Sequence, residues 1–330
     1  VVNDFGAVAV LDCEVLTWEL YKARGARDAY RIALGILVCI IPLLAAVRLL
    51  QGRAKPDRHQ GAARAPSAPP SLQTGPRVLA YLSHVFIVGL GVIIPVSTMV
   101  RWVLAGLEHD AGFASIGGPL VTTVIYATLG AAVVLVASLL PAAFSSRSQS
   151  KGAWIEHGTY ATSSVPGVLL AFGVLHLVLF LEREAPISLG DESLWSWLEG
   201  GSVFLFMGYI MRFLSQGYAA TKPAILQVDT RLVDAARSLG AGTVRRLRHI
   251  WAPSMAPGLL AAYVLLFVAV AKELPVTLML IPAGQQTLAY RVFDAQSEAS
   301  LPDVGLAGLL LVVVVVLVQV ALSRWRRYAR

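Results

Sequence analysis

Long, uninterrupted apolar runs are the feature of this sequence that most limits its possible folds. The run from Leu306 to Leu322 contains a single polar side chain, Gln319. A run of this kind approaches the roughly 20 residues that an α-helix needs to cross the hydrocarbon core of a bilayer. Hydrophobic residues make up 56% of the chain and charged residues only 14%, whereas a soluble domain is nearer about 25% charged. We therefore expect an integral membrane protein and not a cytosolic enzyme.

The apolar runs predict an all-α, polytopic membrane helical bundle. Helices are favoured because a segment in lipid must satisfy its own backbone polar groups. The alternation of a membrane β-strand is missing, since Val312 to Val316 is continuously apolar. Arg212 falls near the end of one run, so its side chain is expected to reach toward the interface. The seven predicted spans are 28–50, 78–106, 119–145, 155–181, 194–218, 258–281 and 303–323.

Basic residues alternate between the connecting segments and predict the orientation. One set of segments contains 17 Lys and Arg, and the other set contains 5. Because basic residues gather on the cytoplasmic side, the N-terminus is expected outside and the C-terminus in the cytoplasm. The net charge of +7 is then an orientation signal, with the lipid bilayer and not nucleic acid as partner. The basic set is 51–77, 146–154, 219–257 and 324–330; the other is 1–27, 107–118, 182–193 and 282–302.

The segment 51–77 is rich in Pro, Ala, Gly and Arg, a composition typical of a flexible cytoplasmic linker. It separates residues 1–50, with one span, from residues 78–330, with six. The first piece resembles the end of the second, since an acidic residue, a Thr-containing amphipathic stretch and a final span follow one another in both. Together with a start that lacks methionine, this similarity predicts a C-terminal fragment of a protein with two repeated halves, as in many transporters.

The 219–257 loop is too polar to cross the membrane and too patterned for a passive linker. Asp229 or Thr230 can cap a first helix, and Gly240 can end it in the left-handed conformation. Thr243 can cap a second helix, which the prolines that follow are expected to close before the next span. The loop would then form a rigid helix–glycine–helix elbow. The alternative is a basic surface loop that meets lipid headgroups.

The spacing in this loop resembles the EAA loop of ABC importer permeases. The residues that carry the resemblance are Asp234-Ala235-Ala236, Gly240, Ile250 and Ala252-Pro253. The family pattern is EAA-x3-G-x9-I-x-L-P, so Asp stands here for Glu and Ala for Leu, with the spacing kept. The resemblance implies a type I ABC importer permease fold. It also implies that Asp234, Ala235, Ala236, Gly240, Ile250 and Pro253 form a coupling element that docks on a cytoplasmic ABC ATPase dimer.

Other stretches resemble the iron(III) branch of these permeases. They are Lys272-Glu273-Leu274-Pro275-Val276-Thr277-Leu278, Thr287-Leu288-Ala289-Tyr290-Arg291-Val292, Asn3-Asp4-Phe5-Gly6-Ala7-Val8 and Tyr160-Ala161 with Val165-Pro166-Gly167-Val168-Leu169. Members of the branch have two fused halves, each with its own EAA loop, and this chain contains the second loop. The resemblance implies delivery of cargo by a periplasmic substrate-binding protein.

Lys272 and Glu273 fall late in the sixth predicted span, beside Pro275. Ionisable groups at membrane depth are costly, and they normally face protein, a partner charge or a water-filled path. One interpretation places Lys272, Glu273 and Pro275 at a translocation pathway or gate, with Asp4 as the corresponding acidic residue of the first half. The other places the pair at the outer interface, bound to neighbours such as Arg291.

The sequence predicts no catalytic residues, no metal site and no cofactor bound by this chain. A G-x-x-x-x-G-K-[ST] loop is missing from it, so ATP would be hydrolysed by a partner subunit. The expected function is a bacterial inner-membrane permease that moves iron(III) by alternating access. The iron assignment rests on resemblance alone, and thiamine, phosphonate, polyamine or sulfate remain open as cargo. An ion-coupled secondary transporter and a membrane-embedded enzyme are the competing classes.

Overall fold

A computed structural model describes residues 14–23, 28–51, 74–108, 116–147, 149–184, 188–189, 192–193, 198 and 202–328. The predicted all-α helical bundle is confirmed over these residues. The two strands present, β1 (Ser188–Leu189) and β2 (Glu192–Ser193), form one short antiparallel pair. Asp4, the Asn3–Val8 motif and most of the 51–77 linker lie outside the described residues.

Each predicted span overlaps at least one helix in the described part of the chain. The helices are α2 (Leu16–Lys22), α3 (Ala29–Gln51), α4 (Thr74–Val88), η1 (Gly89–Ile93), α5 (Ile94–Glu108), α6 (Gly117–Arg147), α7 (Gln149–Ala161), η2 (Thr162–Ser164), α8 (Gly167–Glu184), α10 (Val203–Leu226), α11 (Thr230–Ser238), α12 (Thr243–Arg246), η3 (Leu247–Trp251), α13 (Ala252–Ala271), α14 (Pro275–Leu280), α15 (Leu288–Ser297) and α16 (Leu301–Tyr328).

Four of the described helices are long and apolar enough to cross a membrane, or five if one bent pair counts as a span. The α10 helix is long enough, but Arg212 and Gln216 reduce its hydropathy. The apolar helix Ala29–Pro42 within α3 is shorter than a span. The count of seven crossings therefore remains a prediction. The four helices are Gly75–Glu108, Gly117–Ser146, Thr243–Ala271 and Leu301–Trp325.

The span predicted over 155–181 is not one continuous helix. The chain bends by 97° between α7 with η2 and the following α8. Val165 has an extended backbone, with φ −85° and ψ 126°. Proline disfavours the helical conformation in the residue before it and lacks an N–H to continue the ladder, so Pro166 accounts for the break.

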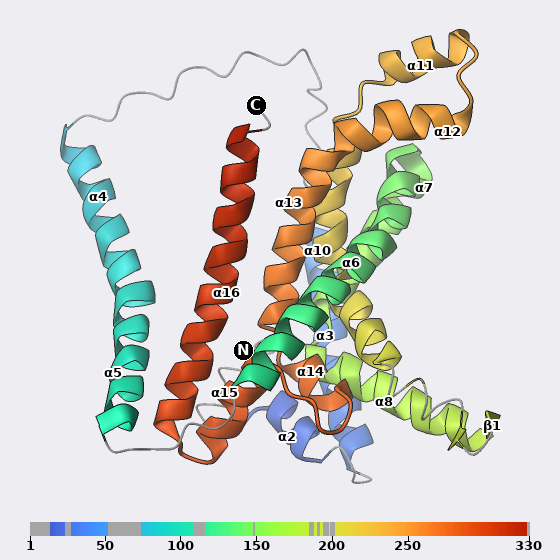
Figure 1. Cartoon of the computed structure of the whole chain (residues 1–330). Coiled ribbons are helices and arrows are strands. Elements are labelled where there is room, and N and C mark those ends of the chain that lie inside the picture. Colours follow the sequence, from blue (N-terminus) through green and yellow to red (C-terminus); the bar gives the residue numbers. More distant parts are fainter. Residues whose placement is uncertain are drawn as a thin grey trace.

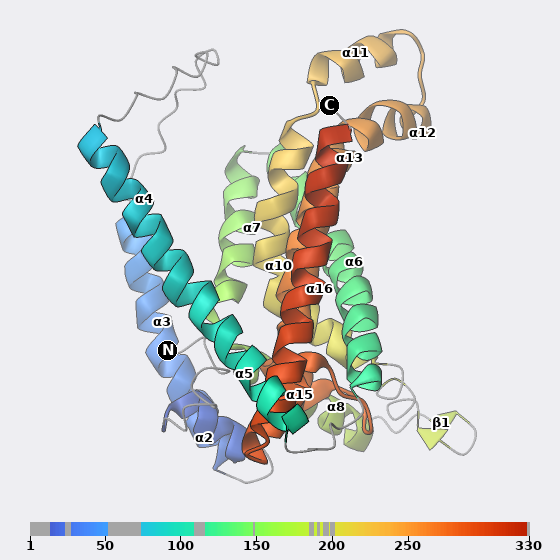
Figure 2. The ribbon, with the colours of Figure 1, turned by 60° about the vertical axis from the view of Figure 1, so that its left-hand side comes forward.

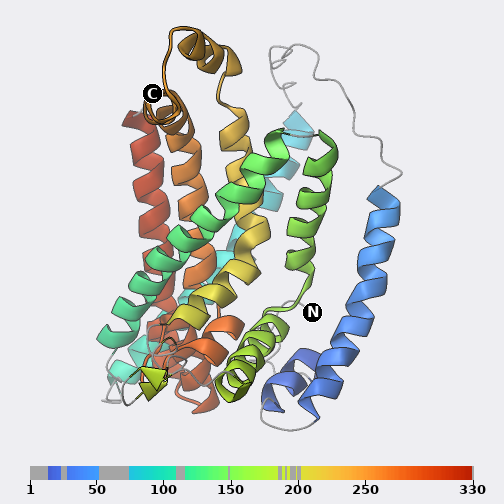
Figure 3. The ribbon, with the colours of Figure 1, turned by 90° about the vertical axis from the view of Figure 1, so that its right-hand side faces the viewer.

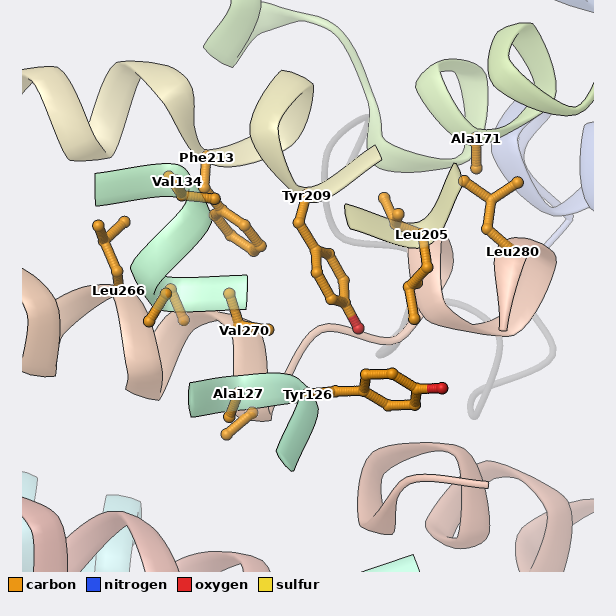
Figure 4. Close-up of a cluster of buried hydrophobic side chains, with 14 of the residues drawn as sticks. Tyr126, Ala127, Val134, Ala171, Leu205, Tyr209, Phe213, Leu266, Val270 and Leu280 are labelled. Carbon is orange, nitrogen blue, oxygen red and sulfur yellow. The ribbon is translucent and has the colours of Figure 1, made fainter. Parts of the chain in front are cut away.

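The centre of the bundle is an apolar cluster between α6, α8, α10, α13 and α14. Tyr209 and Phe213 of α10 lie against Ala127 and Val134 of α6 and Val270 of α13, as Figure 4 shows. Lipid is as apolar as these side chains, so helix association in a membrane depends on close packing and on small residues at the contacts. Close approaches of this kind occur at Gly130, Gly208, Gly217 and Gly258, where an added Cβ would lie within 3.0 Å of a neighbouring atom.

A second apolar cluster joins the N-terminal piece to the rest of the bundle. Leu20 of α2 and Ile36 of α3 are buried with Phe172 of α8 and Leu274, next to α14. Trp18 and Tyr21 pack their rings on Phe293 of α15. The short α2 and α15 each precede a long helix, α3 and α16, as the predicted repeat requires.

The helices run alternately between two ends of the bundle (Figure 1). At one end α11 and α12 project beyond the bundle, and α16 finishes there. At the opposite end lie α2, α14 and α15, and Figure 2 shows α2 and α15 there from a second side. Viewed from the side in Figure 3, α3 and α4 reach the same end as α11. The described helix ends that flank the predicted basic connections, at Gln51, Thr74 and Tyr328, thus lie at the same end of the bundle as the 219–257 loop.

Candidate functional site

The first part of the candidate site is the 219–257 loop, and its first helix begins and ends as the sequence predicts. The carboxylate of Asp229 accepts a hydrogen bond from the Arg231 backbone N–H at 2.9 Å, which caps α11. Asp234, Ala235 and Ala236 lie within α11, where Asp234 and Ala235 are exposed and Ala236 is half-buried. The EAA-like residues therefore stand on a helix that projects from the bundle.

Gly240 ends α11 in the left-handed conformation, with φ +76°. The Gly240 N–H donates to the Arg237 carbonyl at 3.0 Å, and the Ala241 N–H donates to the Ala236 carbonyl at 2.9 Å. This pair of hydrogen bonds is the Schellman motif, which satisfies the last carbonyls of a helix and requires a residue that tolerates positive φ. The sharp turn at Gly240 is thus fixed by the backbone itself.

The second helix of the loop differs from the prediction in two respects. Gly242, and not Thr243, is the N-cap residue, and no side chain caps this end. The prolines do not close the helix, because it continues through Pro253 and Pro257 as one helix, Thr243–Ala271. A π-helical turn at Leu247–Trp251 precedes Pro253, with the Ala252 N–H donating to the Leu247 carbonyl.

The π turn lies directly before the turn of helix that contains Pro253. A proline removes a hydrogen-bond donor, and both prolines and turns with an i→i+5 pattern are sites where a helix departs from regular geometry. The consequence is that the loop and the sixth predicted span are one element. Ile250 lies in the π turn and is half-buried, whereas Pro253 is exposed.

Two hollows separate α11 from the helices beneath it. One, of about 530 Å³, is lined by Ala236, Ala241, Arg245 and Ile250 among others. The other, of about 400 Å³, reaches from Val233 of α11 to α6 and α10. Leu232, Leu239 and Val244 are also exposed apolar side chains in this region. The elbow therefore presents a hollowed surface of apolar and basic side chains at the end of the bundle where α11 and α12 project.

The second part of the candidate site lies where α13 stops. Lys272 is the C-cap residue of α13, and Pro275 is the first residue of α14. The predicted span 258–281 is therefore interrupted between Ala271 and Pro275, as the missing N–H of proline would favour. The Tyr209 hydroxyl is hydrogen-bonded to Thr277 Oγ1 at 2.7 Å, and Thr277 Oγ1 donates to the Glu273 carbonyl at 2.7 Å.

Glu273 pairs with Arg212 and not with Arg291. The Glu273 Oε1 atom lies 3.8 Å from Arg212 Nε, and the two side chains are only 9% and 13% exposed. Arg291 instead approaches Asp294 and Asp303, each at 3.1 Å. The expectation that Arg212 reaches toward the interface is also wrong, because Arg212 lies inside α10, well away from both ends of that helix.

The start of α8 closes over this Arg212–Glu273 pair. A Cβ on Gly167 would lie 3.1 Å from Glu273 Oε1, 3.3 Å from Pro275 Cγ and 3.4 Å from Arg212 Nε. Negative charge is stabilised near the N-terminus of a helix. The structure thereby brings together the two stretches around Gly167 and Glu273 that were singled out separately in the sequence.

A cavity of about 1270 Å³ extends from this pair between α10, α13 and α16. Its lining runs along α10 from Arg212 to Ala220 and reaches Ser323 of α16, so the cavity runs toward the end that carries α11. Lys272, Glu273 and Pro275 all line it. The residues predicted for a pathway therefore surround one continuous hollow, with the exception of Asp4, which lies outside the described residues.

Sequence reasoning missed Arg212 as a member of this site. The available signal was an arginine in an apolar run, but the predicted end of that span at 218 placed Arg212 near an interface. The helix continues to Leu226 instead.

Comparisons with known proteins agree with this architecture. A family model described as "Binding-protein-dependent transport system inner membrane component" matches residues 134–329. The Fe(3+)-transport system permease protein FbpB 2 of Haemophilus influenzae is 23% identical over 307 residues, which are 90% of this chain and 57% of the relative. The putative 2-aminoethylphosphonate transport system permease protein PhnV of Salmonella typhimurium is 27% identical over 171 residues, which are 52% of this chain and 60% of the relative.

Among solved structures, inward-facing conformations of the MetNI methionine ABC transporter give a TM-score of 0.46 at 19% identity. The match covers 64% of this chain and 94% of that chain. This chain spans less than two thirds of the length of either curated relative. The family match takes in most of the helical bundle, the 219–257 loop and the Arg212–Glu273 pair, and its family is one of transport permeases and not of enzymes. The chain therefore belongs to the family of inner-membrane components of binding-protein-dependent transport systems.

Proposed function

We propose that this chain is part of the membrane permease of an ATP-driven importer, with the 219–257 loop as its coupling element. The observation that carries the proposal is the continuity of the loop with a spanning helix. Gly240 fixes a sharp turn after α11, and the helix that follows runs unbroken from Thr243 to Ala271. A displacement of the loop by a partner would therefore move that helix directly.

The proposed partners are a cytoplasmic ABC ATPase dimer and a periplasmic substrate-binding protein. The apolar side chains and hollows around α11 support docking of the ATPase at this end. ATP would be bound and hydrolysed by that partner, with no cofactor on this chain. This assignment places the C-terminus in the cytoplasm and the N-terminus outside.

The proposed organisation is that of a C-terminal part of a two-half permease. Residues 1–50 would end the first half, residues 51–77 would form the linker, and residues 78–330 would form the second half. The shares of the curated relatives that this chain covers support the idea. The proposed pathway passes Lys272, Glu273 and Pro275, with Asp4 as the corresponding residue of the first half.

Iron(III) is the proposed cargo, and a phosphonate is the second candidate. Iron is supported by the resemblance at Lys272–Leu278 and by the name of the Haemophilus influenzae relative. A phosphonate is supported by the name of the Salmonella typhimurium relative. ATP-dependent uptake of each labelled cargo, measured separately in the reconstituted transporter, distinguishes the two candidates.

The coupling role is tested by Gly240→Val in the complete permease, reconstituted with its ATPase. A β-branched residue at φ +76° costs about 1–2 kcal/mol relative to glycine, which corresponds to a factor of roughly 5–30. We expect ATP hydrolysis stimulated by the loaded binding protein to fall by about that factor. Asp234→Ala, which leaves the turn intact, should have a smaller effect.

Gly240→Asn is the matched control, because asparagine tolerates the left-handed region far better than valine. It should retain most of the stimulation. Full stimulation and transport by Gly240→Val, in a variant that still assembles with the ATPase, would show that this loop is not the coupling element.

A further inference from the structure

We propose that the cavity between α10, α13 and α16 binds an oxyanion group of the transported molecule, with Arg212 and Lys272 as its recognition residues. The inference deepens the proposed function, on which it rests, by naming the chemical class of the cargo. The charged side chains on the cavity wall support this assignment. Two of the lining side chains are cationic, Arg212 and Lys272, and one is anionic, Glu273. The polar side chains beside them, Gln216, Gln319 and Ser323, are neutral.

The hydrogen-bonding capacity of Arg212 is unused in the described part of the chain. Its Nε atom is buried and has no hydrogen-bond partner there. The approach to Glu273 at 3.8 Å is an ion pair but too long for a hydrogen bond. The guanidinium carbon lies 5.8 Å from the ring of Phe213, which stabilises the cation without using any donor. A planar guanidinium with free donors matches the geometry of a carboxylate or phosphonate.

Within the pair, the Glu273 carboxylate makes more contacts with the surrounding protein than the Arg212 guanidinium does. Its Oε1 atom accepts from the Val276 N–H at 3.4 Å and lies at the start of α8, beside Gly167. These contacts hold the carboxylate against the protein wall. The charge that remains open to the cavity is therefore positive, and exposed Lys272 adds to it at the same end.

A cation that faces a cavity at membrane depth is costly unless a partner charge or water compensates it. An anionic group on the cargo would supply that compensation during transport. A hard cation such as bare iron(III) prefers oxygen ligands, and the one carboxylate on the cavity wall already faces Arg212. Two cargoes share the required chemistry: a phosphonate, and iron(III) carried as an anionic carboxylate chelate.

The test uses the complete transporter in proteoliposomes, with its ATPase and its binding protein. Labelled ferric citrate and labelled 2-aminoethylphosphonate are supplied separately, and the amount accumulated per ATP hydrolysed is measured. Loss of hydrogen bonds between the Arg212 guanidinium and an anionic group of the cargo should weaken cargo binding by about 10- to 100-fold. We expect Arg212→Gln to reduce the ratio by that factor for the transported anion, while ATP hydrolysis stays stimulated. Lys272→Gln should reduce it less, and Arg212→Lys should restore part of it.

Arg212→Gln alone leaves Glu273 buried without its partner and can impair folding. The double variant Arg212→Gln/Glu273→Gln removes both charges and keeps the shape, so its ratio should stay low if Arg212 recognises the cargo. Arg183→Gln is the matched control, because the Arg183 side chain is 85% exposed at the end of α8 and lies outside the cavity lining. It should behave as the wild type.

Three outcomes would overturn the inference. A wild-type ratio in the double variant would mean that Arg212 serves only to neutralise Glu273. Import of a cationic cargo such as thiamine, with neither anion accumulated, would exclude an anion site while leaving the importer proposal intact. If the wild-type transporter accumulates no cargo on ATP hydrolysis, both the proposed function and this inference are wrong.

Discussion

At Gly208, α10 comes close to α14. A Cβ at this position would lie 2.6 Å from Val276 Cγ1 and 2.8 Å from Leu280 Cδ1. These distances are shorter than van der Waals contact, so with a larger residue these side chains or the two helices must shift. Because α14 begins two residues after Glu273, such a shift would also disturb the Arg212–Glu273 pair.

Gly208→Ala should therefore lower the stability of the complete permease. Overpacking costs about 1–3 kcal/mol, and the better helix propensity of alanine returns at most about 1 kcal/mol, so the sum is a net loss. We expect a lower melting temperature in detergent.

Gly173→Ala provides the comparison, since nothing lies within 4 Å of a Cβ at Gly173 in α8. Only the gain in helix propensity applies there, and the melting temperature should be unchanged or higher. An equal response of the two variants would contradict the close approach at Gly208.

At the scale of elements, α5 and α16 form the contact that holds the helix Gly75–Glu108 to the bundle. None of the apolar window of that helix is buried. Gly305 of α16 lies against it, because a Cβ there would be 2.7 Å from the Met99 carbonyl oxygen and 3.3 Å from Trp102 Cβ. Small residues at such crossings let helix backbones approach in lipid.

A disulfide tests this contact directly. The native Cys13 and Cys39 are first replaced by serine. A Cβ at Gly305 would force α5 and α16 slightly apart, because it would lie 2.7 Å from the Met99 carbonyl oxygen, and this brings the 3.3 Å to Trp102 Cβ into the range of about 3.5–4.5 Å that a disulfide needs. Trp102→Cys/Gly305→Cys should therefore cross-link on oxidation. A protease site placed at 109–115 then reports the bond, because the two fragments stay together on a non-reducing gel.

Gly91→Cys/Gly305→Cys is the negative control, as nothing lies within 4 Å of a Cβ at Gly91. Separation of the fragments in the Trp102 variant, or equal linking in both, would mean that α5 does not pack on α16 as described.

The elements also show which parts of the fold the sequence could predict. Asp229 and Gly240 form hydrogen bonds with backbone groups only a few residues away. The start and end of α11 could therefore be predicted from the local sequence. The Arg212–Glu273 pair joins residues far apart in the chain, and an error in one helix end was enough to hide it. The bend after η2 had two signals in the sequence, Pro166 and the polar Thr162-Ser163-Ser164 before it, but the apolar run that follows Pro166 led to one span being predicted across the break.

The π turn at Leu247–Trp251 was the hardest feature to foresee. Prolines usually end helices, but here the helix continues past Pro253 and Pro257, with a wider turn just before Pro253. Periodicity alone therefore predicted two helices where the protein has one.

For the whole molecule, the alternation of the helices predicts which side of the membrane each connection faces. The 219–257 loop should be cytoplasmic, and the connection around α15 should face outward. Ser238 and Ser297 are exposed on these two segments, and serine-to-cysteine exchange changes little else.

In the chain without native cysteines, Ser297→Cys should react with a membrane-impermeant maleimide in intact spheroplasts. Ser238→Cys should react only after the membrane is permeabilised. The reverse pattern would invert the topology and move the loop away from any cytoplasmic partner.

The unbroken helix from Thr243 to Ala271 also has a mechanical consequence. At 1.5 Å per residue it is a rod of about 43 Å, and a tilt of about 5° about one end carries the other end by about 4 Å. One end carries the turn at Gly240 and the other carries Lys272. A shift of that size is comparable with the 3.8 Å between Arg212 Nε and Glu273 Oε1. A small rotation imposed at the loop would therefore be enough to open or close the ion pair, because the same helix connects the two sites. Bending at the π turn, or at Pro253 and Pro257 beyond it, would reduce the movement that reaches Lys272.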